Sequence, residues 1–469
     1  MKRVIFALGI LLAFACSKTT ENSATIIPSN PTLTTLTPAP KFIINNFTIT
    51  NFSIPNITGA QIQIGVNGSI SGTILYSKDN ILNLVIPATL FFTTPLIPAI
   101  HLIKSNNNWQ YENSYDDGAM GCARNYECID SLNQSWVYAD HGFELSSGTW
   151  PFGNMMLMRT TGNKLSFTNI SNDRSFYHSI STGDLNNDGT KDVVGLNMGT
   201  KGNWYDNLHT YLQNKDGTFT ENRTILVSNL LGGRGAGAVL IKDLFGDSRP
   251  EVIKADYGFN SNYQKPSDRY SFMIFSYNTA TNKYELSKDP GPIGVYTNND
   301  RGTTSIKAAD FNKDGALDLA IATEGTKFNG IEIWMNDGKG NFTPSNQKLE
   351  YTFDQLQFRE FEVFDYDKDG YPDIFLNPWS GKLFKDGSAV FMDNLIWKNS
   401  VGIFGSITKG ITIPNINPTF MKAFFIDNQI TYMGIKGNID GSITLNEINP
   451  NYLKGLTFHY VDRMSEVID

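Results

Sequence analysis

A short acidic loop followed at once by an apolar run recurs along the chain, and no other feature limits the fold as strongly. The four clear copies read DLNNDGTKDVVGLN from Asp184, DLFGDSRPEVIKAD from Asp243, DFNKDGALDLAIAT from Asp310 and DYDKDGYPDIFLNP from Asp365. Their starts lie 59, 67 and 55 residues apart. A repeat at this spacing indicates a fold built from copies of one supersecondary unit.

Three fainter copies extend the repeat toward both ends of the chain. They are SKDNILNLVIPA near Asp79, CIDSLNQSWVYADHG near Asp130 and FFIDNQITYMGIKG with Asp427. A second pattern follows the copies of the acidic loop along the chain. It consists of a strand, a Gly/Asn/Asp turn and an aromatic or apolar residue. Its copies are HLIKSNNNWQYE, MLMRTTGNKLSF, YLQNKDGTFTE, FSYNTATNKYEL, IWMNDGKGNFTP and LIWKNSVGIFGS. Turn residues between two β-rich runs predict hairpins.

Each unit therefore holds an acidic loop, a buried strand, a variable connection and a hairpin, which makes about four strands. Four strands at a period of 55–67 residues predict propeller blades rather than a solenoid, whose repeats are usually shorter. The last unit is short of strands, and KFIINNFTITNF at residues 41–52 would complete it by pairing the two chain ends. We therefore expect an all-β, seven-bladed β-propeller over residues 41–469.

The units resemble FG-GAP/VCBS repeats, the blades of the integrin-α-like N-terminal propeller, from about residue 60 to the C-terminus. Three acidic loops match the calcium motif of that family fully, the Asp243 loop matches it in part, and three units match only through their strands. The resemblance implies structural calcium sites that staple blade turns rather than contact a partner.

The residues of the loops point to the same ion. Loop positions 1, 3, 5 and 9 offer side-chain oxygens and position 7 offers a carbonyl, and hard oxygens converging in this way suit Ca²⁺. The predicted ligands are Asp184, Asn186, Asp188, Asp192 and the Thr190 carbonyl; Asp310, Asn312, Asp314, Asp318 and the Ala316 carbonyl; and Asp365, Asp367, Asp369, Asp373 and the Tyr371 carbonyl. Gly189, Gly315 and Gly370 at position 6 allow the turn around the ion. We expect about three structural Ca²⁺ ions, one for each intact loop.

Two other interpretations of the loops are weaker. An EF-hand needs a bidentate Glu at position 12, where this chain has Gly195, Ile321 and Leu376, and β-rich runs follow in place of a helix. A metal-free Asp/Asn/Gly turn suits one loop better than three loops in register. In the Asp243 loop, Phe245 replaces a donor and Ser248 the turn glycine, so Asp243, Asp247 and Glu251 predict a weak or vacant site.

The N-terminus reads as an export signal. MKRVIFALGILLAFAC has a positive start and an apolar stretch too short to span a bilayer. Residues 1–16 therefore predict a lipoprotein signal peptide with Cys16 as the acylated residue, and an ordinary signal peptide is the alternative. Residues 17–40 are rich in Ser, Thr and Pro and predict an extended tether. These features predict a lipid anchor at the outer membrane or cell surface.

Two cysteines remain, Cys122 and Cys128 in GCARNYEC. Because an exported protein meets an oxidising compartment, we expect a short-loop disulfide between them, with two thiols as the alternative.

The charge and the motifs limit the function. The net charge is −8, the isoelectric point is about 5.3, and Lys/Arg clusters are absent, which argues against a nucleic-acid partner. No catalytic motif occurs in a fitting context, and Asp140, His141 and Glu144 form the best remaining polar cluster. We expect a monomeric binding protein rather than an enzyme, with a protein or glycan partner on a loop face. The alternative is a polysaccharide lyase or hydrolase with its site in the propeller channel.

Overall fold

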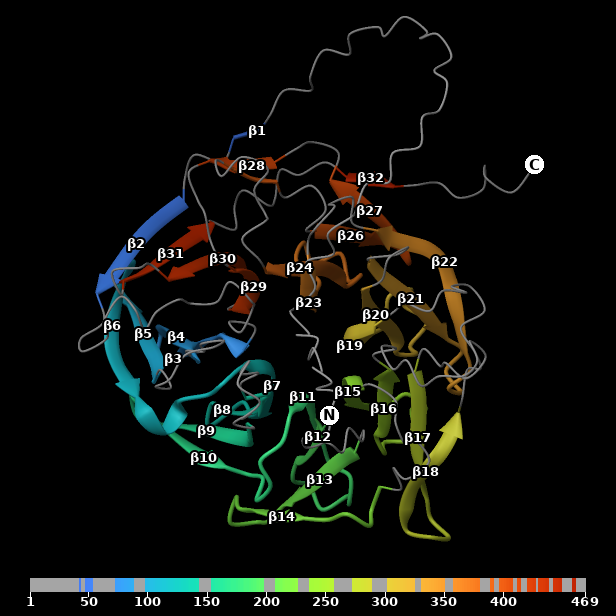
Figure 1. Cartoon of the computed structure of the whole chain (residues 1–469). Coiled ribbons are helices and arrows are strands. Elements are labelled where there is room, and N and C mark those ends of the chain that lie inside the picture. Colours follow the sequence, from blue (N-terminus) through green and yellow to red (C-terminus); the bar gives the residue numbers. More distant parts are fainter. Residues whose placement is uncertain are drawn as a thin grey trace, which may run out of the picture.

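The strands of the chain group into antiparallel sheets that stand like blades around a common axis (Figure 1). In this computed structural model the described residues are 42–43, 47–53, 72–87, 98–142, 153–197, 207–226, 236–256, 272–288, 302–324, 330–350, 357–379, 389–391, 396–407, 411–414, 420–426, 429–437, 442–448 and 458–460. The predicted signal peptide, Cys16, the tether and Asp427 lie outside these residues.

Five separate four-stranded sheets form blades 1 to 5. Blade 1 is β3 (Ile74–Lys78), β4 (Ile81–Ile86), β5 (Ala99–Ser105) and β6 (Asn108–Tyr115), and blade 2 is β7 (Ala123–Asp130), β8 (Ser135–Asp140), β9 (Met155–Thr161) and β10 (Lys164–Asn169). Blade 3 is β11 (Tyr177–Gly183), β12 (Asp192–Asn197), β13 (Asn207–Gln213) and β14 (Phe219–Glu221), and blade 4 is β15 (Ala236–Lys242), β16 (Glu251–Asp256), β17 (Phe272–Asn278) and β18 (Lys283–Lys288). Blade 5 is β19 (Gly302–Ala309), β20 (Asp318–Glu324), β21 (Gly330–Asn336) and β22 (Phe342–Glu350).

Blades 6 and 7 complete the ring. Blade 6 is β23 (Gln357–Phe364), β24 (Asp373–Trp379), β26 (Ile396–Ser400) and β27 (Ile403–Ile407), with β32 (Phe458–Tyr460) at its edge. Blade 7 is β29 (Phe420–Ile426), β30 (Gln429–Gly437), β31 (Ser442–Ile448) and β2 (Phe47–Ser53). A single pairing of Trp379 with Phe420 joins the two sheets. The predicted seven-bladed propeller is confirmed.

The ring closes through the N-terminal segment, as the sequence predicts. Strand β2 pairs antiparallel with β31, from Phe47 opposite Ile448 to Ser53 opposite Ser442. The first part of the same segment belongs to a different, small sheet. In this sheet β1 (Phe42–Ile43) pairs with β28 (Ile411–Pro414), which also pairs with β25 (Ala389–Phe391). Pairing both chain ends in one blade removes a free edge from the sheet.

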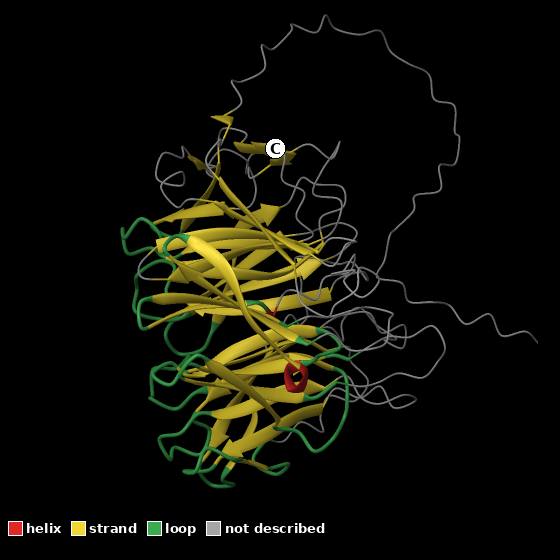
Figure 2. Cartoon of the chain, turned by 90° about the vertical axis from the view of Figure 1, so that its left-hand side faces the viewer, coloured by secondary structure: helices red, strands yellow, loops and turns green. Residues whose placement is uncertain are grey.

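The repeat markers fall at equivalent places in the blades. Each described acidic loop joins the first and second strands of its blade, and each predicted hairpin joins the third and fourth. In an antiparallel blade both turns lie at the same end of the strands, and most described loops gather along one side of the disc (Figure 2). The acidic loops therefore share one face of the propeller.

The hydrophobic core is divided among the interfaces between blades. Each buried cluster draws its side chains from neighbouring blades, such as Val194 of blade 3 with Phe275 of blade 4, or Leu240 of blade 4 with Ile321 of blade 5. Because both faces of a blade are covered, the second strands read as nearly continuous apolar runs. This explains the apolar stretch directly after each acidic loop.

The predicted disulfide is wrong. Cys122 and Cys128 are not bonded to each other. Residues 123–130 form the extended strand β7, in which the five steps from Ala123 to Cys128 alone span about 16 Å at about 3.3 Å per residue. Cys122 lies one residue before this strand. A disulfide needs Cα atoms within about 7 Å. The Cys122 backbone instead connects to the end of β8, because its N–H donates to Asp140 Oδ1 and its carbonyl accepts from the His141 N–H.

Candidate metal centres in the acidic loops

The first aspartate of each loop holds the turn closed. Asp184 accepts the N–H groups of Asp188 at 3.0 Å and Gly189 at 2.8 Å. The same bonds recur from Asp314 and Gly315 to Asp310, and from Gly370 to Asp365. Position 6 takes a left-handed backbone, with φ of +86°, +90° and +86° at Gly189, Gly315 and Gly370, which a side chain rarely adopts. The turn itself therefore favours glycine at this position.

Positions 3 and 5 face one another inside the turn. In the Asp184 loop, the Asn186 amide donates to Asp188 Oδ2 at 2.9 Å and its carbonyl oxygen accepts the Asp188 N–H at 3.1 Å. Asn312 and Asp314 repeat both bonds at 2.7 and 3.0 Å. The position 7 residues Thr190, Ala316 and Tyr371 donate their N–H to the position 5 aspartate. The predicted donors are thus brought together in the Asp184 and Asp310 loops.

The acid at position 9 is a buried hub for three segments. Asp192 accepts the Leu185 N–H from its own loop and the Gln213 N–H from β13, both at 2.9 Å. Asp318 and Asp373 make the equivalent pairs of bonds, to Phe311 and Asn336 and to Tyr366 and Asn399. All three carboxylates are fully buried. The sequence predicts these acids only as ligands, and their role in joining loop, second strand and third strand is a finding of the structure.

Side chains from the next blade reach back to these loops. The Asn336 amide donates to the Leu244 carbonyl at 2.9 Å, and the Asn399 amide donates to the Phe311 carbonyl at 2.8 Å. Both asparagines also give their backbone N–H to the position 9 acid of their own blade. The Asp243 and Asp310 loops are therefore each tied to the next blade, and anything that stiffens one of these loops acts on a blade interface.

Burial makes the position 9 carboxyls hard to ionise. It raises the pKa of Asp192 and of Asp318 to about 6, although two backbone hydrogen bonds lower each of them. Burial raises the pKa of Asp373 to about 8, and the neighbouring Asp367 and Asp369 charges raise it further. Carboxylates packed together in this way favour a proton or a cation beside them.

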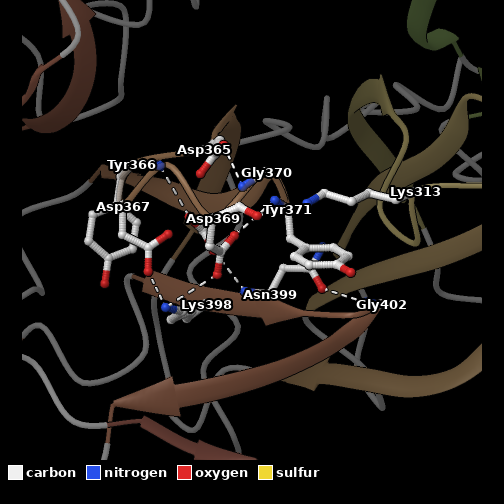
Figure 3. Close-up of polar contacts among 11 residues, drawn as sticks. Lys313, Asp365, Tyr366, Asp367, Asp369, Gly370, Tyr371, Lys398, Asn399 and Gly402 are labelled. Atoms are coloured by element: carbon white, nitrogen blue, oxygen red, sulfur yellow. Dashed lines mark hydrogen bonds and ion pairs between the residues drawn. The ribbon is translucent and has the colours of Figure 1, made fainter. Parts of the chain in front are cut away.

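The Asp365 loop has the donor arrangement that best fits a cation (Figure 3). Asp365, Asp367 and Asp373 each place one carboxylate oxygen within 4.8 Å of the other two. Asp365 Oδ1 is buried and has no hydrogen-bond partner among the described residues. A buried carboxylate oxygen without a donor is unfavourable, and an ion coordinated by the three oxygens would satisfy it. The residues present therefore fit a hard metal ion.

Two lysines also approach this loop, and the sequence pattern does not reveal either. Lys398 of β26 contacts Asp367 Oδ2 and lies 3.5 Å from Asp369 Oδ2 (Figure 3). Lys313, from the acidic loop of blade 5, donates to the Asp369 carbonyl at 2.7 Å and stacks on the Tyr371 ring at 3.8 Å. Lys398 thus offsets part of the acidic charge of the Asp365 loop.

The Asp243 loop keeps the turn and loses donors. Asp243 accepts the N–H groups of Gly246, Asp247 and Ser248, and Glu251 accepts the Leu244 N–H. Ser248 takes a φ of +70° where the other loops have glycine, so the turn is strained there. Phe245 packs beside Gly340 of blade 5 and within the core between blades 4 and 5. An apolar contact has replaced a donor at this position of the loop.

A second group of candidate ligands was not predicted. Asp173, His209 and Glu221 each place one atom within 4.8 Å of the others. Arg223 already binds both acids, at 2.6 Å from Asp173 and 2.5 Å from Glu221. The His209 nitrogens lie 3.2 Å from the Tyr177 hydroxyl and 3.3 Å from the Asn197 amide. This group is a satisfied polar network.

Asp140 and His141 of the predicted polar cluster are held by contacts within the fold. Asp140 is buried and accepts the N–H groups of Cys122 and Gly142. His141 stacks on Phe176 at 4.6 Å between ring centroids. Glu144 lies outside the described residues.

Charged side chains from three blades meet at the propeller axis, and the sequence analysis did not predict this. Lys422 of β29 is fully buried, 3.3 Å from Glu360 and 3.9 Å from Glu362 of β23, and Lys307 of β19 lies 3.6 Å from Glu362. Lys422 also stacks on the Tyr126 ring of β7 at 4.2 Å. Burial raises the pKa of Glu360 to about 7, with Lys422 acting in the opposite direction. We call Lys307, Glu360, Glu362 and Lys422 the axial charge network.

Among the described residues, no helix is both long and apolar enough to span a membrane.

Comparison with known proteins supports the blades. The FG-GAP-like repeat family matches residues 184–253 and 310–376, and each match contains two of the four acidic loops. No curated protein matches the chain in sequence.

The solved structures that align with the chain at low similarity include two proteins. The periplasmic gluconolactonase of Pseudomonas aeruginosa aligns with a TM-score of 0.45 and 9% identity, over 81% of this chain and 99% of its own. A protein from Lactobacillus plantarum aligns with a TM-score of 0.35 and 12% identity, over 71% of this chain and 98% of its own. Similarity at this level says nothing about activity. From its repeats and its blades, the chain is a seven-bladed β-propeller that carries FG-GAP-like repeats.

Proposed function

We propose that the chain is a Ca²⁺-binding propeller of the cell envelope, in which about three ions staple the acidic loops while the loop face binds a protein or glycan partner. The observation that carries the calcium part is the Asp365 loop, where three carboxylates converge and one buried oxygen has no donor among the described residues. The donors are oxygens only, which suits Ca²⁺ better than a transition metal. The Asp184 and Asp310 loops repeat the turn and the buried acid, which supports one site in each.

Calcium titration of the chelator-stripped full-length chain tests this proposal. The Asp310→Asn/Asp314→Asn variant should lose one binding site, because two charged donors become neutral amides. The matched variant Asp243→Asn/Asp247→Asn changes the same two positions in the Asp243 loop, where Phe245 stands in place of a donor. This variant should lose no binding site. Calorimetry gives the number of sites in each chain. Absence of binding, or equal numbers in all three chains, would contradict the proposal.

Lys398 should limit the affinity of the Asp365 loop. In blades 5 and 6 an asparagine, Asn336 or Asn399, donates its backbone N–H to the buried acid at position 9. The residue before this asparagine is Met335 in blade 5 and Lys398 in blade 6, so Lys398→Met copies the neighbouring blade. Removing an ammonium in contact with two ligands should tighten Ca²⁺ binding there by about tenfold or more. A competition titration with a calcium dye measures the change. The control is Lys368→Met, which removes the same charge from an exposed position of the same loop and should have a much smaller effect. Equal affinities for Lys398→Met and the native chain would contradict this role.

The anchor and the partner belong to the same proposal. Cys16 is the proposed lipid attachment site and residues 17–40 the tether, and a Cys16→Ser chain should leave the membrane fraction. The proposed partner surface is the face that carries the strand-joining turns. There Leu132, at the β7–β8 turn, is 93% exposed, and an exposed apolar side chain at a loop tip can anchor a partner. Loss of partner binding in a Leu132→Asp chain would support this surface, and unchanged binding would exclude Leu132 as an anchor.

The second candidate is an enzyme that acts on polysaccharide. One observation favours it. Glu127 and Glu360 line the same cleft at the propeller axis, and burial raises the pKa of both carboxyl groups. Turnover that is lost in Glu360→Gln and kept in the calcium-loop variants would support an enzyme. Absence of turnover across a polysaccharide panel would remove this candidate.

A further inference from the structure

The acidic loops of blades 5 and 6 touch each other directly. Lys313 stands at position 4 of the loop in blade 5. Its ammonium donates to the Asp369 carbonyl at 2.7 Å and lies 3.8 Å from the centre of the Tyr371 ring (Figure 3). The Lys313 side chain also fills the space in which Gly370 would carry a Cβ. One lysine of blade 5 therefore covers positions 5 to 7 of the loop in blade 6, where two of the predicted calcium ligands lie.

The turn of the loop in blade 5 sets the direction of Lys313. Its backbone is left-handed, with a φ of +62°. The turn that imposes this conformation is closed by Asp310, which accepts the N–H groups of Asp314 and Gly315. An ion held by the same aspartates would fix this turn further. Order in the blade 5 loop therefore passes through Lys313 to the blade 6 loop.

A second contact joins the same two loops through an asparagine of β26. The Asn399 amide donates to the Phe311 carbonyl in the loop of blade 5, and its backbone N–H donates to Asp373, the position 9 acid of blade 6, both at 2.8 Å. The turn after β26 is equally close, because a Cβ on Gly402 would press on the side chain of Asn312. The two loops therefore meet at both halves of the blade 6 site.

We propose that Lys313 couples the calcium sites of blades 5 and 6, so that an ion in either loop strengthens binding in the other. This inference rests on the proposed calcium sites. The first ion orders Lys313 and the segment that it covers, so the second ion enters a loop that is already ordered. Coupling of this kind is reciprocal. Repulsion between the two ions opposes it, and solvent around the exposed loops screens that repulsion.

The blade 3 site has no such link to the other two proposed sites. Position 4 of its loop is Asn187, which takes the same left-handed backbone with a φ of +60° and carries no charge. Its neighbour in the ring is blade 4, whose acidic loop lacks a donor at Phe245 (Figure 1). The sites of blades 3 and 5 should therefore bind calcium independently.

The test is calorimetric titration of full-length, chelator-stripped chains with calcium. A two-site chain keeps the sites of blades 5 and 6, and two single-site chains keep one of them each. Sites are removed in blade 3, 5 or 6 by Asp184→Asn/Asp188→Asn, Asp310→Asn/Asp314→Asn or Asp365→Asn/Asp369→Asn. The coupling ratio is the product of the two association constants in the two-site chain divided by the product of the single-site constants. Because Lys313 is exposed, we expect a ratio of about five, at the lower end of the usual range.

Lys313→Asn in all three chains should bring the coupling ratio to about one. This change copies position 4 of the blade 3 loop, where Asn187 keeps the left-handed turn. The ratio cancels any direct effect of the lost charge on either site, because every chain carries the substitution. The matched control is Lys368→Asn, which removes the same charge from position 4 of the blade 6 loop, where the backbone is also left-handed with a φ of +64°. It should leave the ratio unchanged.

The outcomes separate this inference from the calcium proposal. Calcium binding in both loops with a coupling ratio of one would overturn the coupling and leave the calcium sites standing. A ratio that survives Lys313→Asn, or that falls equally in Lys368→Asn, would overturn the role of Lys313. The same ratio measured for the sites of blades 3 and 5 should be about one, and an equal ratio there would also contradict a direct contact as the cause. Absence of calcium binding in every chain would overturn both proposals.

Discussion

Replacing Lys422 with methionine is expected to lower the free energy of unfolding by about 3–5 kcal/mol. The Lys422 side chain is fully buried and lies 3.3 Å from Glu360 and 3.9 Å from Glu362. Methionine keeps the volume and removes the charge, so Glu360 loses the ammonium that contacts it, and Glu362 keeps only Lys307, at 3.6 Å, of the two lysines beside it. A buried carboxylate without a compensating charge is costly, because burial strips its water. Denaturant unfolding followed by circular dichroism measures the loss.

Arg223→Met provides the control for this prediction. Arg223 also binds two carboxylates, Asp173 and Glu221, but its side chain is 59% exposed. Solvent screens such a pair, and its loss should change stability by no more than about 1 kcal/mol. Adding Glu360→Gln to Lys422→Met should restore part of the stability, because it removes one of the uncompensated charges. Equal losses in Lys422→Met and Arg223→Met would contradict a stabilising axial charge network.

Asp373→Ala is the second large effect, and it should be visible even without metal. Asp373 is fully buried and accepts the Tyr366 N–H at 3.2 Å and the Asn399 N–H at 2.8 Å. Alanine leaves both donors without their acceptor, which should lower the free energy of unfolding by about 2–4 kcal/mol. The measurement is denaturant unfolding in excess EGTA, so that any bound ion is removed from both chains.

Asp369→Ala separates the hub from the rest of the loop. Asp369 belongs to the same loop and is also a predicted ligand, but its side chain is 35% exposed. Of the backbone donors in the part of the chain that the structure describes, only the Tyr371 N–H reaches it. In EGTA, Asp369→Ala should lower the free energy of unfolding much less than Asp373→Ala does. If the two variants are equally stable under chelation, the acid at position 9 does not stabilise the fold by joining the loop to the second and third strands.

The blades could be predicted because their signals are local. A left-handed glycine turn, two aspartates that cap it and the apolar strand after it all lie within one short segment, and this segment recurs every 55–67 residues. The hairpin between the third and fourth strands is equally local. Counting these markers is therefore enough to give seven blades, including the closure of blade 7 by β2.

What the sequence does not reveal depends on contacts between distant segments. Lys398 reaches Asp367 from another strand of the blade, and the charges at the axis come from strands of different blades. No local pattern marks Glu360 or Lys422, because inner strands of a propeller meet only after the ring closes. The Cys122–Cys128 prediction failed for the opposite reason, since short spacing brings two residues together in a turn but holds them apart in an extended strand.

The most direct test of the account is thermal unfolding of the full-length chain with calcium and with excess EGTA, together with a count of bound metal. We predict about three calcium ions for each chain and a large fall in melting temperature on chelation, because ions that bind only the folded loops stabilise them by mass action. No bound calcium and an unchanged melting temperature would contradict the account. The acidic loops would then be turns held by their own hydrogen bonds.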